Sequence, residues 1–472
     1  MTTLRFHGSA AVLLLPLALF VAVTARLFIS EAAFDLTGLA AAGVLTLFSG
    51  SLLAKAPSEY WKAAVRGASS ELTGTVVLIL IASGIFSAMM KASGVADGLV
   101  FLGGMLHLTG HAFTVFVLLA SSLMAAATGS SIGTLLAAMP IFFPAGVALG
   151  ADPAMLAGAM LSGAIFGDNL APVSDVTVIS SVTQRFRDGT PADIAGVVRT
   201  RLPYAMTALA VSMPVYAFMG ASRPVSEAAL SGDASALLML VPVAVLIAVA
   251  VRTRDVLMAI SAGTVTGTAT GLLIGRLSFA TIFAADDGRL SGFLISGISN
   301  VSPIILLCVT LFAFTGIVRE AGVPDMMAKA LEAGSAGRPS ALRTELFLSA
   351  ATLVVTTLFA AVTSASVALV GSLTDDIGRA SNVHPYRRSH ILSGLANSLP
   401  VLMPFSAFVL ITMAAVSGLE GAAAVTPFTL MTAAFYPIAL FLVFGFMVLT
   451  GTGRMMETPE PEAAEAKTAT AL

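Results

Sequence analysis

Long apolar stretches separated by few charges dominate this sequence. Many of these stretches run for about 17 to 25 residues, the length that an α-helix needs to cross a hydrocarbon layer of about 30 Å. Only 11% of the 472 residues are charged and the mean hydropathy is +0.95, so the chain lacks the polar residues that would cover a soluble globule. These features predict a polytopic α-helical membrane protein and exclude an ordinary soluble enzyme.

Charge and cysteine content exclude several other classes of function. The net charge is −2 and the basic residues are scattered, so no nucleic-acid partner is expected. Cys308 is the single cysteine, which excludes a disulfide framework and a thiolate metal site. The apolar stretch 10–25 is followed almost at once by another, so we interpret it as an uncleaved first helix.

Apolar windows predict eight simple spans. They lie at 12–29, 36–54, 75–90, 204–219, 236–251, 256–274, 301–318 and 428–449. Two longer regions, 112–183 and 343–416, contain polar, Gly-containing or Pro-containing interruptions at 128–131, 167–172, 363–366 and 396–400. Non-helical backbone inside a bilayer is tolerated only where it is buried or lines a wet cavity. These four breaks are therefore where we expect the functional site.

The two halves of the chain resemble each other. Segments 91–97, 128–132 and 161–163 recur in the same order at 319–325, 363–367 and 392–394, with offsets of 228, 235 and 231 residues. This predicts two inverted-topology repeats, each of about five transmembrane helices and one re-entrant hairpin, with broken helices at the midplane. The expected parts are a first repeat 1–219 (hairpin 112–150, broken helix 154–183), an external linker 220–234, a second repeat 235–450 (hairpin 345–373, broken helix 387–416) and a disordered cytoplasmic tail 451–472.

The distribution of basic residues predicts the orientation. Seven Lys or Arg residues lie in the segments flanking the second hairpin, whereas Lys91 alone flanks the first. By the positive-inside rule the two hairpins then open to opposite faces. We expect a multi-pass protein of the cytoplasmic (inner) membrane with both termini cytoplasmic. The loop 184–202, which carries Arg185, Arg187, Arg199 and Arg201, is also placed inside.

Two carboxylates lie within apolar sequence in the first broken helix. An acidic side chain inside a bilayer is costly and is by default a functional hypothesis. Asp168 and Asp175 flank Pro172, which lacks an amide donor and frees carbonyls before it. Carboxylate and carbonyl oxygens suit Na⁺ or H⁺, and a site that holds one or the other gives exchange. We expect Asp168 and Asp175 to bind the ion (metal: Na⁺), with Asn169, Ser174 and Thr177 beside them.

Hydroxyl and amide side chains mark the other breaks. They could complete the ion shell, bind an organic substrate, or serve as contacts between helices. The residues are Thr128, Ser130, Ser131, Thr363, Ser364, Ser366, Asn397 and Ser398. The second broken helix offers no carboxylate at membrane depth, and Asp375 is interpreted as a solvated residue at a span end.

The segment 167–177, Gly-Asp-Asn-Leu-Ala-Pro-Val-Ser-Asp-Val-Thr, resembles the NhaC-type Na⁺/H⁺ antiporters of the ion transporter superfamily. Their pattern there is approximately G-D-x-x-[SA]-P-x-S-D-x-T, and this chain keeps every fixed position. The segment 127–134 is similar to the preceding hairpin tip of that family. The resemblance implies that Asp168 and Asp175 handle cation and proton, with Ser130, Ser131, Ser174 and Thr177 nearby.

The function expected from these features is exchange of Na⁺ for H⁺ by a secondary active transporter that works by alternating access. The alternative is a Na⁺- or H⁺-coupled symporter or exchanger of a small carboxylate or amino acid. Gly-Ser-Ser-Ile-Gly at 129–133 spells a hydrolase motif but follows a membrane helix rather than a strand, so no enzyme is expected. We expect no cofactor besides the transported ions. The expected partners are membrane lipid and a small cation, with an organic anion or amino acid as the alternative cargo, and a homodimer is left open.

Overall fold

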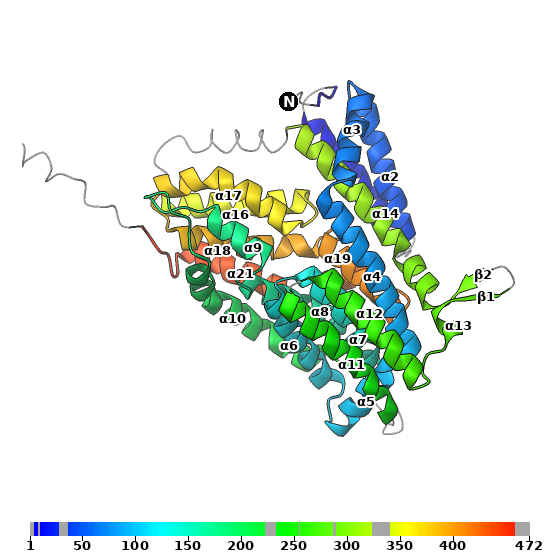
Figure 1. The fold of residues 1–472 in the computed structure, drawn as a ribbon. Coiled ribbons are helices and arrows are strands. Elements are labelled where there is room, and N and C mark those ends of the chain that lie inside the picture. The colour runs from blue at the N-terminus through cyan, green and yellow to red at the C-terminus, as the bar shows by residue number, and fades with distance from the viewer. Residues whose placement is uncertain are drawn as a thin grey trace, which may run out of the picture.

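The structure is a computed structural model and describes residues 4–7, 10–27, 36–221, 233–253, 255–286, 289–322 and 340–457. These residues are almost entirely helical (Figure 1). The first half contains α1 (Leu14–Ala25), α2 (Leu36–Leu53), α3 (Pro57–Ala68), α4 (Glu71–Ser93), α5 (Val95–Met105), α6 (Gly110–Thr128), α7 (Ser131–Ala148), α8 (Pro153–Leu170), α9 (Asp175–Val182) and α10 (Ile194–Met219). The second half contains α11 (Leu240–Thr253), α12 (Val256–Leu273), α13 (Phe279–Ile282), the hairpin β1 (Ala284–Asp286) and β2 (Arg289–Ser291), α14 (Phe293–Glu320), α16 (Ala341–Leu358), α17 (Thr363–Ala380), α18 (Pro385–Ala396), α19 (Ala407–Val416), α20 (Pro427–Ala433) and α21 (Phe435–Thr450).

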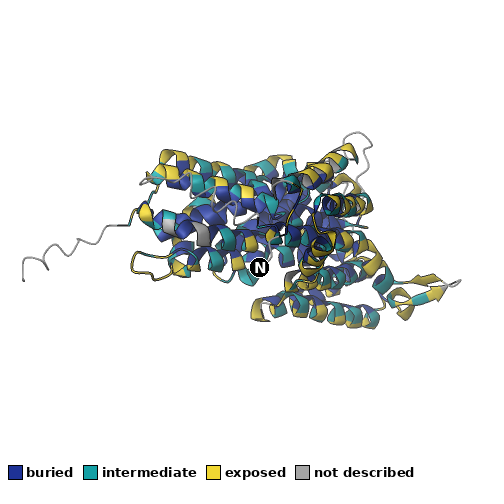
Figure 2. Ribbon diagram, turned by 90° about the horizontal axis from the view of Figure 1, so that it is seen from above, coloured by how far each residue is buried: buried dark blue, intermediate teal, exposed yellow. Residues whose placement is uncertain are grey.

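The expected all-α polytopic fold is confirmed. In the described part of the chain, nine helices are long and apolar enough to cross a membrane, and two bent pairs raise the number to eleven. The bent pairs are α18 with α19 and α20 with α21. The buried residues gather along the centre of the helix assembly, and the outer helix faces are exposed and apolar, as lipid contact requires (Figure 2).

Each half contributes one hairpin and one broken helix in the same order. In the first half, α6 and α7 form the hairpin and α8 and α9 the broken helix. In the second half, α16 and α17 form the hairpin and α18 and α19 the broken helix. The second hairpin extends beyond the expected 345–373 at both ends. Of the repeated segments, residues 323–325 lie outside the described part, as do 222–232 of the expected linker.

Glycines bring the first broken helix against the first hairpin. A Cβ atom at Gly163 would lie 2.2 Å from the carbonyl oxygen of Leu118, and one at Gly167 would lie 2.1 Å from that of Ser122. The spacing of four residues puts both glycines on one face of α8, so its backbone touches that of α6. Close packing here fixes the end of α8, which carries the break, relative to the hairpin tip.

The last expected span, 428–449, is bent rather than simple. Helices α20 and α21 meet at an angle of 53°. The Tyr216 hydroxyl of α10 enters the gap, donating to the Ala433 carbonyl (2.8 Å) and accepting from the Phe435 amide (2.9 Å). A side chain that enters the helical hydrogen-bond ladder bends the helix, and it replaces the bonds that the bend removes.

Two expectations about charged groups were wrong. Arg199 and Arg201 belong to α10 rather than to a loop, and Arg201 is fully buried. Asp375 is 8% exposed and bonds Arg388 at 2.6 Å, so it is a buried ion-pair partner and not a solvated residue. The positive-inside rule counts basic residues along the chain without distinguishing an arginine that turns inward.

A buried carboxylate also lies in the second half, where the sequence suggested none at depth. Glu345 of α16 is completely buried and lies 2.9 Å from both Arg387 and Arg454. The beginning of the expected disordered tail takes part in this region. Residues 451–457 are ordered, and the Met455 carbonyl accepts from the amide of His384 (3.1 Å). The remainder of the tail, 458–472, lies outside the described residues.

Candidate functional site

The first broken helix is interrupted over the four residues between Leu170 and Asp175. Pro172 has no N–H group, so the Asp168 carbonyl lacks its usual partner four residues ahead. The Ala171 amide is instead shared between the carbonyls of Gly167 (3.0 Å) and Asp168 (3.2 Å). The chain turns out of the helix here, and α9 restarts at Asp175. Carboxylates therefore flank both sides of the interruption.

Asp168 is a covered carboxylate tied to the first hairpin. Its side chain is 5% exposed, and the Ser131 hydroxyl donates to its Oδ2 across 3.1 Å. Ser131 is the first residue of α7, and Ser130 before it caps that helix by accepting from the Gly133 amide (3.0 Å). Gly129 ends α6 with a φ of +70°, a conformation that glycine adopts without strain. The tip sequence thus builds the turn and aims a hydroxyl at Asp168.

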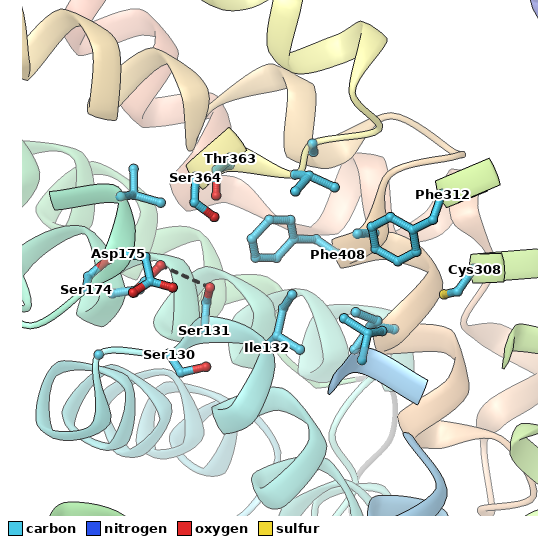
Figure 3. A pocket seen from close by; sticks show the side chains of 18 residues that line it. Ser130, Ser131, Ile132, Ser174, Asp175, Cys308, Phe312, Thr363, Ser364 and Phe408 are labelled. Atoms are coloured by element: carbon cyan, nitrogen blue, oxygen red, sulfur yellow. Dashed lines mark hydrogen bonds between the residues drawn. The ribbon is translucent and has the colours of Figure 1, made fainter. Parts of the chain in front are cut away.

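A cavity of about 150 Å³ lies between the two hairpin tips. Ser130 and Ser131 face it from one side and Thr363 and Ser364 from the other, as Figure 3 shows. Opposed tips are the arrangement that two repeats of opposite orientation produce. The cavity is lined by Val76, Gly129, Ser130, Ser131, Ile132, Asp168, Ser174, Asp175, Val176, Cys308, Phe312, Ala361, Val362, Thr363, Ser364, Ala407, Phe408 and Ile411.

The two carboxylates differ in exposure. Asp175 is exposed and lines the cavity, whereas Asp168 is covered behind Ser131. They are close enough to repel each other electrostatically. A cation in the cavity would relieve this repulsion, and so would a proton on either carboxylate.

Four helices begin at this cavity: α7, α9, α17 and α19. The N-terminus of a helix carries a partial positive charge and unpaired N–H groups. Four such ends stabilise negative charge in the cavity. Ser406 caps α19 by accepting from the Val409 amide (3.1 Å). Ala407 and Phe408, the first two residues of this helix, line the cavity.

The opposite wall of the cavity is apolar. Phe312 and Cys308 come from α14, Phe408 and Ile411 from α19, and Val76 from α4. Sequence analysis missed these residues, because apolar side chains in apolar spans give no signal that separates a cavity wall from a lipid face.

The structure brings together seven of the thirteen residues predicted for the site. Those that line the cavity are Asp168, Asp175, Ser174, Ser130, Ser131, Thr363 and Ser364. The other six do not line it: Asn169, Thr177, Thr128, Ser366, Asn397 and Ser398.

The hydroxyls among these six residues are occupied within the protein. Thr128 donates to the Met124 carbonyl (2.9 Å) and Ser398 to that of Leu395 (2.7 Å). Ser366 bonds Thr356 across the second hairpin (3.0 Å). These residues are helix and hairpin contacts, which is the other role that the sequence left open for them.

Asn169 and Thr177 face away from the cavity, toward a buried polar cluster. The Asn169 carbonyl oxygen accepts from Ser393 (3.2 Å), and its amide donates to the Tyr436 hydroxyl (3.3 Å). Thr177 accepts from the Arg201 guanidinium (2.8 Å). Sequence analysis missed Arg201 as a residue of this region. The available signal was an arginine seven residues inside the apolar helix 194–219.

The first half of the chain is similar to a known protein family. A family model described as "Na⁺/H⁺ antiporter family" matches residues 3–221, which include the first hairpin, the break and both carboxylates. The resemblance that the motif at 167–177 indicates is thereby confirmed for this half.

Two curated relatives match shorter parts of this chain. The malate-2H⁺/Na⁺-lactate antiporter of Bacillus subtilis is 33% identical over 158 residues, covering 34% of this chain and 32% of the relative. The Na⁺/H⁺ antiporter NhaC of Alkalihalophilus pseudofirmus is 39% identical over 104 residues, covering 21% and 22%. The chain thus matches a third or less of the length of either relative.

Solved structures give weaker similarity. The YdaH transporter of Alcanivorax borkumensis aligns over 83% of this chain and 88% of that chain, with 12% sequence identity and a TM-score of 0.39. A TM-score this low carries no inference about this chain.

Proposed function

We propose that the protein is a secondary active transporter that exchanges Na⁺ for H⁺ across the cytoplasmic membrane by alternating access. The observation that carries this proposal is the covered carboxylate of Asp168, held by Ser131 beside a cavity that both hairpin tips line. The match of residues 3–221 to the Na⁺/H⁺ antiporter family model supports the same activity, and so does the similarity to NhaC. No enzymatic step and no cofactor is part of the proposal.

Competition at the carboxylates couples the two ions. A carboxylate that holds a proton loses the charge that attracts Na⁺, and bound Na⁺ disfavours protonation of the same group. The empty site is charged, so reorienting it from one face of the membrane to the other is costly. Each reorientation therefore takes place with either Na⁺ or H⁺ bound, and the favoured cycle is exchange of one ion for the other.

Alternating access follows from opposed hairpin tips. The cavity lies between Ser131 on one tip and Thr363 on the other. Separation of either tip from the carboxylates would open the site to one face, while the other tip keeps it closed. We place both termini on the cytoplasmic face because the basic residues around the second hairpin favour that orientation.

A second candidate function has a specific observation in its favour. The cavity of about 150 Å³ is larger than one Na⁺ requires, and its far wall is apolar. Cavities of this size accommodate a small organic molecule. A small carboxylate could place its charge at the helix N-termini, and one similar protein is named a malate-2H⁺/Na⁺-lactate antiporter. Na⁺- or H⁺-coupled transport of such an anion is the alternative.

Transport by purified protein in liposomes tests the proposed exchange. An outward Na⁺ gradient should drive proton uptake, and an imposed pH gradient should drive ²²Na⁺ flux. Asp168→Asn should reduce both to the level of protein-free vesicles, because the amide holds neither ion as a carboxylate does. The matched control is Asp97→Asn, which makes the same chemical change at a side chain on α5 that is 60% exposed, and it should transport normally. Undiminished flux in Asp168→Asn would reject the assigned role.

Ligand-dependent thermal stabilisation separates the two candidates. A ligand that binds only the folded state raises the unfolding temperature as its concentration exceeds the dissociation constant. The proposed function predicts stabilisation by Na⁺ alone that is lost in Asp168→Asn. Stabilisation by L-malate or lactate, dependent on Na⁺ or pH, would favour the alternative.

A further inference from the structure

Arg201 differs from the other fully buried arginines of the described chain. Arg387 lies 2.9 Å from Glu345, and Arg388 lies 2.6 Å from Asp375, so each has a carboxylate partner. Arg201 is equally buried, but no carboxylate of the described residues lies within ion-pair distance. Its guanidinium donates only to hydroxyls, those of Thr177 and Ser393, and its Nε has no hydrogen-bond partner.

The guanidinium lies directly behind the broken helix. Thr177 is in the first turn of α9, just after the break. Ser393 of α18 accepts from Arg201 and donates its own hydroxyl hydrogen to the Asn169 side-chain oxygen. Asn169 follows Asp168 directly in the sequence. Arg201 is thereby bonded, directly or through one serine, to both sides of the interruption. Its charge also acts on Asp168 across this cluster.

A buried, unpaired guanidinium is costly, and the cost indicates a role. Removing an ion from water costs several kcal/mol unless another charge compensates it. Arginine does not lose its proton in proteins, so this charge persists through every state of the transporter. The low dielectric of the protein interior strengthens the attraction between the Arg201 guanidinium and the Asp168 carboxylate. A fixed positive charge therefore lies directly behind the broken helix, next to the cavity but outside its lining.

We propose that Arg201 sets the net charge of the ion site, so that transport exchanges one Na⁺ for one H⁺ and moves no net charge across the membrane. Two carboxylates, Asp168 and Asp175, and one guanidinium leave a single negative charge when the site is empty. One monovalent cation neutralises it, whether Na⁺ or H⁺. Both loaded forms are then neutral and can cross, whereas the empty form cannot. The inference rests on the proposed Na⁺/H⁺ exchange and adds its stoichiometry.

Null-flux measurements on the wild-type protein in liposomes test the stoichiometry. The ratio of internal to external K⁺, with valinomycin, sets the membrane potential. The Na⁺ gradient at which net ²²Na⁺ flux stops is then measured with a tenfold H⁺ gradient across the membrane. One-for-one exchange requires a tenfold Na⁺ gradient at any potential. One net charge per cycle would shift the balance about 50-fold for a potential of about 100 mV. A voltage-dependent balance would overturn this inference while leaving exchange intact. Absence of any exchange would overturn the proposed function as well.

Variants of Arg201 then assign the charge to this residue. Arg201→Gln keeps hydrogen-bond donors for Thr177 and Ser393 but leaves two negative charges, so its null gradient should become voltage-dependent or its flux should fall to background. Arg201→Lys keeps the charge and should keep a voltage-independent balance. A purely structural role would lower the flux of both variants without moving the balance. A voltage-independent null gradient in Arg201→Gln with substantial flux would overturn the assignment of the charge to Arg201. If that variant does not fold, the null gradient of the wild-type protein still decides the stoichiometry.

Discussion

Ser131, the first residue of α7, donates its hydroxyl hydrogen to Oδ2 of Asp168, two residues before the end of α8, across 3.1 Å. This bond joins the tip of the first hairpin to the broken helix. It also favours the ionised carboxylate, which is the form that binds a cation.

Ser131→Ala should therefore weaken Na⁺ binding. A hydrogen bond to a charged group contributes about 1.5 kcal/mol or somewhat more, so its loss should lower the apparent Na⁺ affinity about tenfold. Na⁺-dependent thermal stabilisation at fixed pH measures the change. Ser122→Ala is the matched control, because that buried hydroxyl bonds only the Leu118 carbonyl of its own helix. Equal affinities in the two variants would remove Ser131 from the site.

The position of the site could be predicted from sequence because its signals are local. A glycine at the hairpin tip, a proline in an apolar helix and two flanking carboxylates lie within short segments, and each has a direct backbone consequence. Gly129 and Pro172 act where the sequence predicts a break. The pairing of the two tips was accessible only because the halves resemble each other.

Features that depend on which way a helix faces could not be predicted. Arg201 and Asp375 look like surface charges in the sequence, and their burial arises from contacts with segments roughly 190 and 13 residues away. One sequence gives the period of a helix but not its neighbours. Asn169 illustrates the same limit, since it adjoins Asp168 along the chain yet bonds to different elements, α18 and α21, instead of the first hairpin.

Glu345→Gln should destabilise the protein strongly. Glu345 is fully buried between Arg387 and Arg454, so the amide would leave two guanidinium groups without their counter-charge. Breaking a buried ion pair from one side costs about 3 to 5 kcal/mol. Thermal unfolding in detergent should show a large fall in midpoint.

The control is Glu59→Gln on α3. Its partner is Lys62, both side chains are at least half exposed, and pairs of this kind contribute little. A midpoint for Glu345→Gln as high as that of the control would show that the cluster is not stabilised by its central carboxylate.

Ala361→Gly should stabilise the second hairpin tip. Ala360 and Ala361 have φ values of +50° and +59°, a left-handed conformation that costs a residue with a Cβ about 1 to 2 kcal/mol. The first hairpin has glycine at the matching turn. The gain should be about 1 kcal/mol by denaturant unfolding, reduced by the greater freedom of glycine in the unfolded chain. Ala365→Gly, at an exposed position inside α17, should destabilise by a similar amount. If both variants lose stability alike, the tip is not strained.

Tyr216→Phe should destabilise the protein by removing the hydroxyl around which the last helices bend. Without it, the Ala433 carbonyl and the Phe435 amide lose their partner, and the Ser162 hydroxyl, which lies 2.7 Å away, keeps only the Tyr436 amide. Unsatisfied buried groups cost about 1 to 3 kcal/mol each, so the loss should exceed that of one hydrogen bond unless α20 and α21 straighten into a single helix. Thermal unfolding measures the loss, and Tyr204→Phe, whose hydroxyl has no hydrogen bond to any described residue, should change little.

The same variant, Tyr216→Phe, should also affect the ion site. Helix α21 carries Tyr436, which bonds Asn169, so straightening of α20 and α21 would move the back of the site. The Na⁺ affinity of Tyr216→Phe should then fall along with its stability. Full stability together with unchanged Na⁺ affinity would show that the bend does not depend on this hydroxyl.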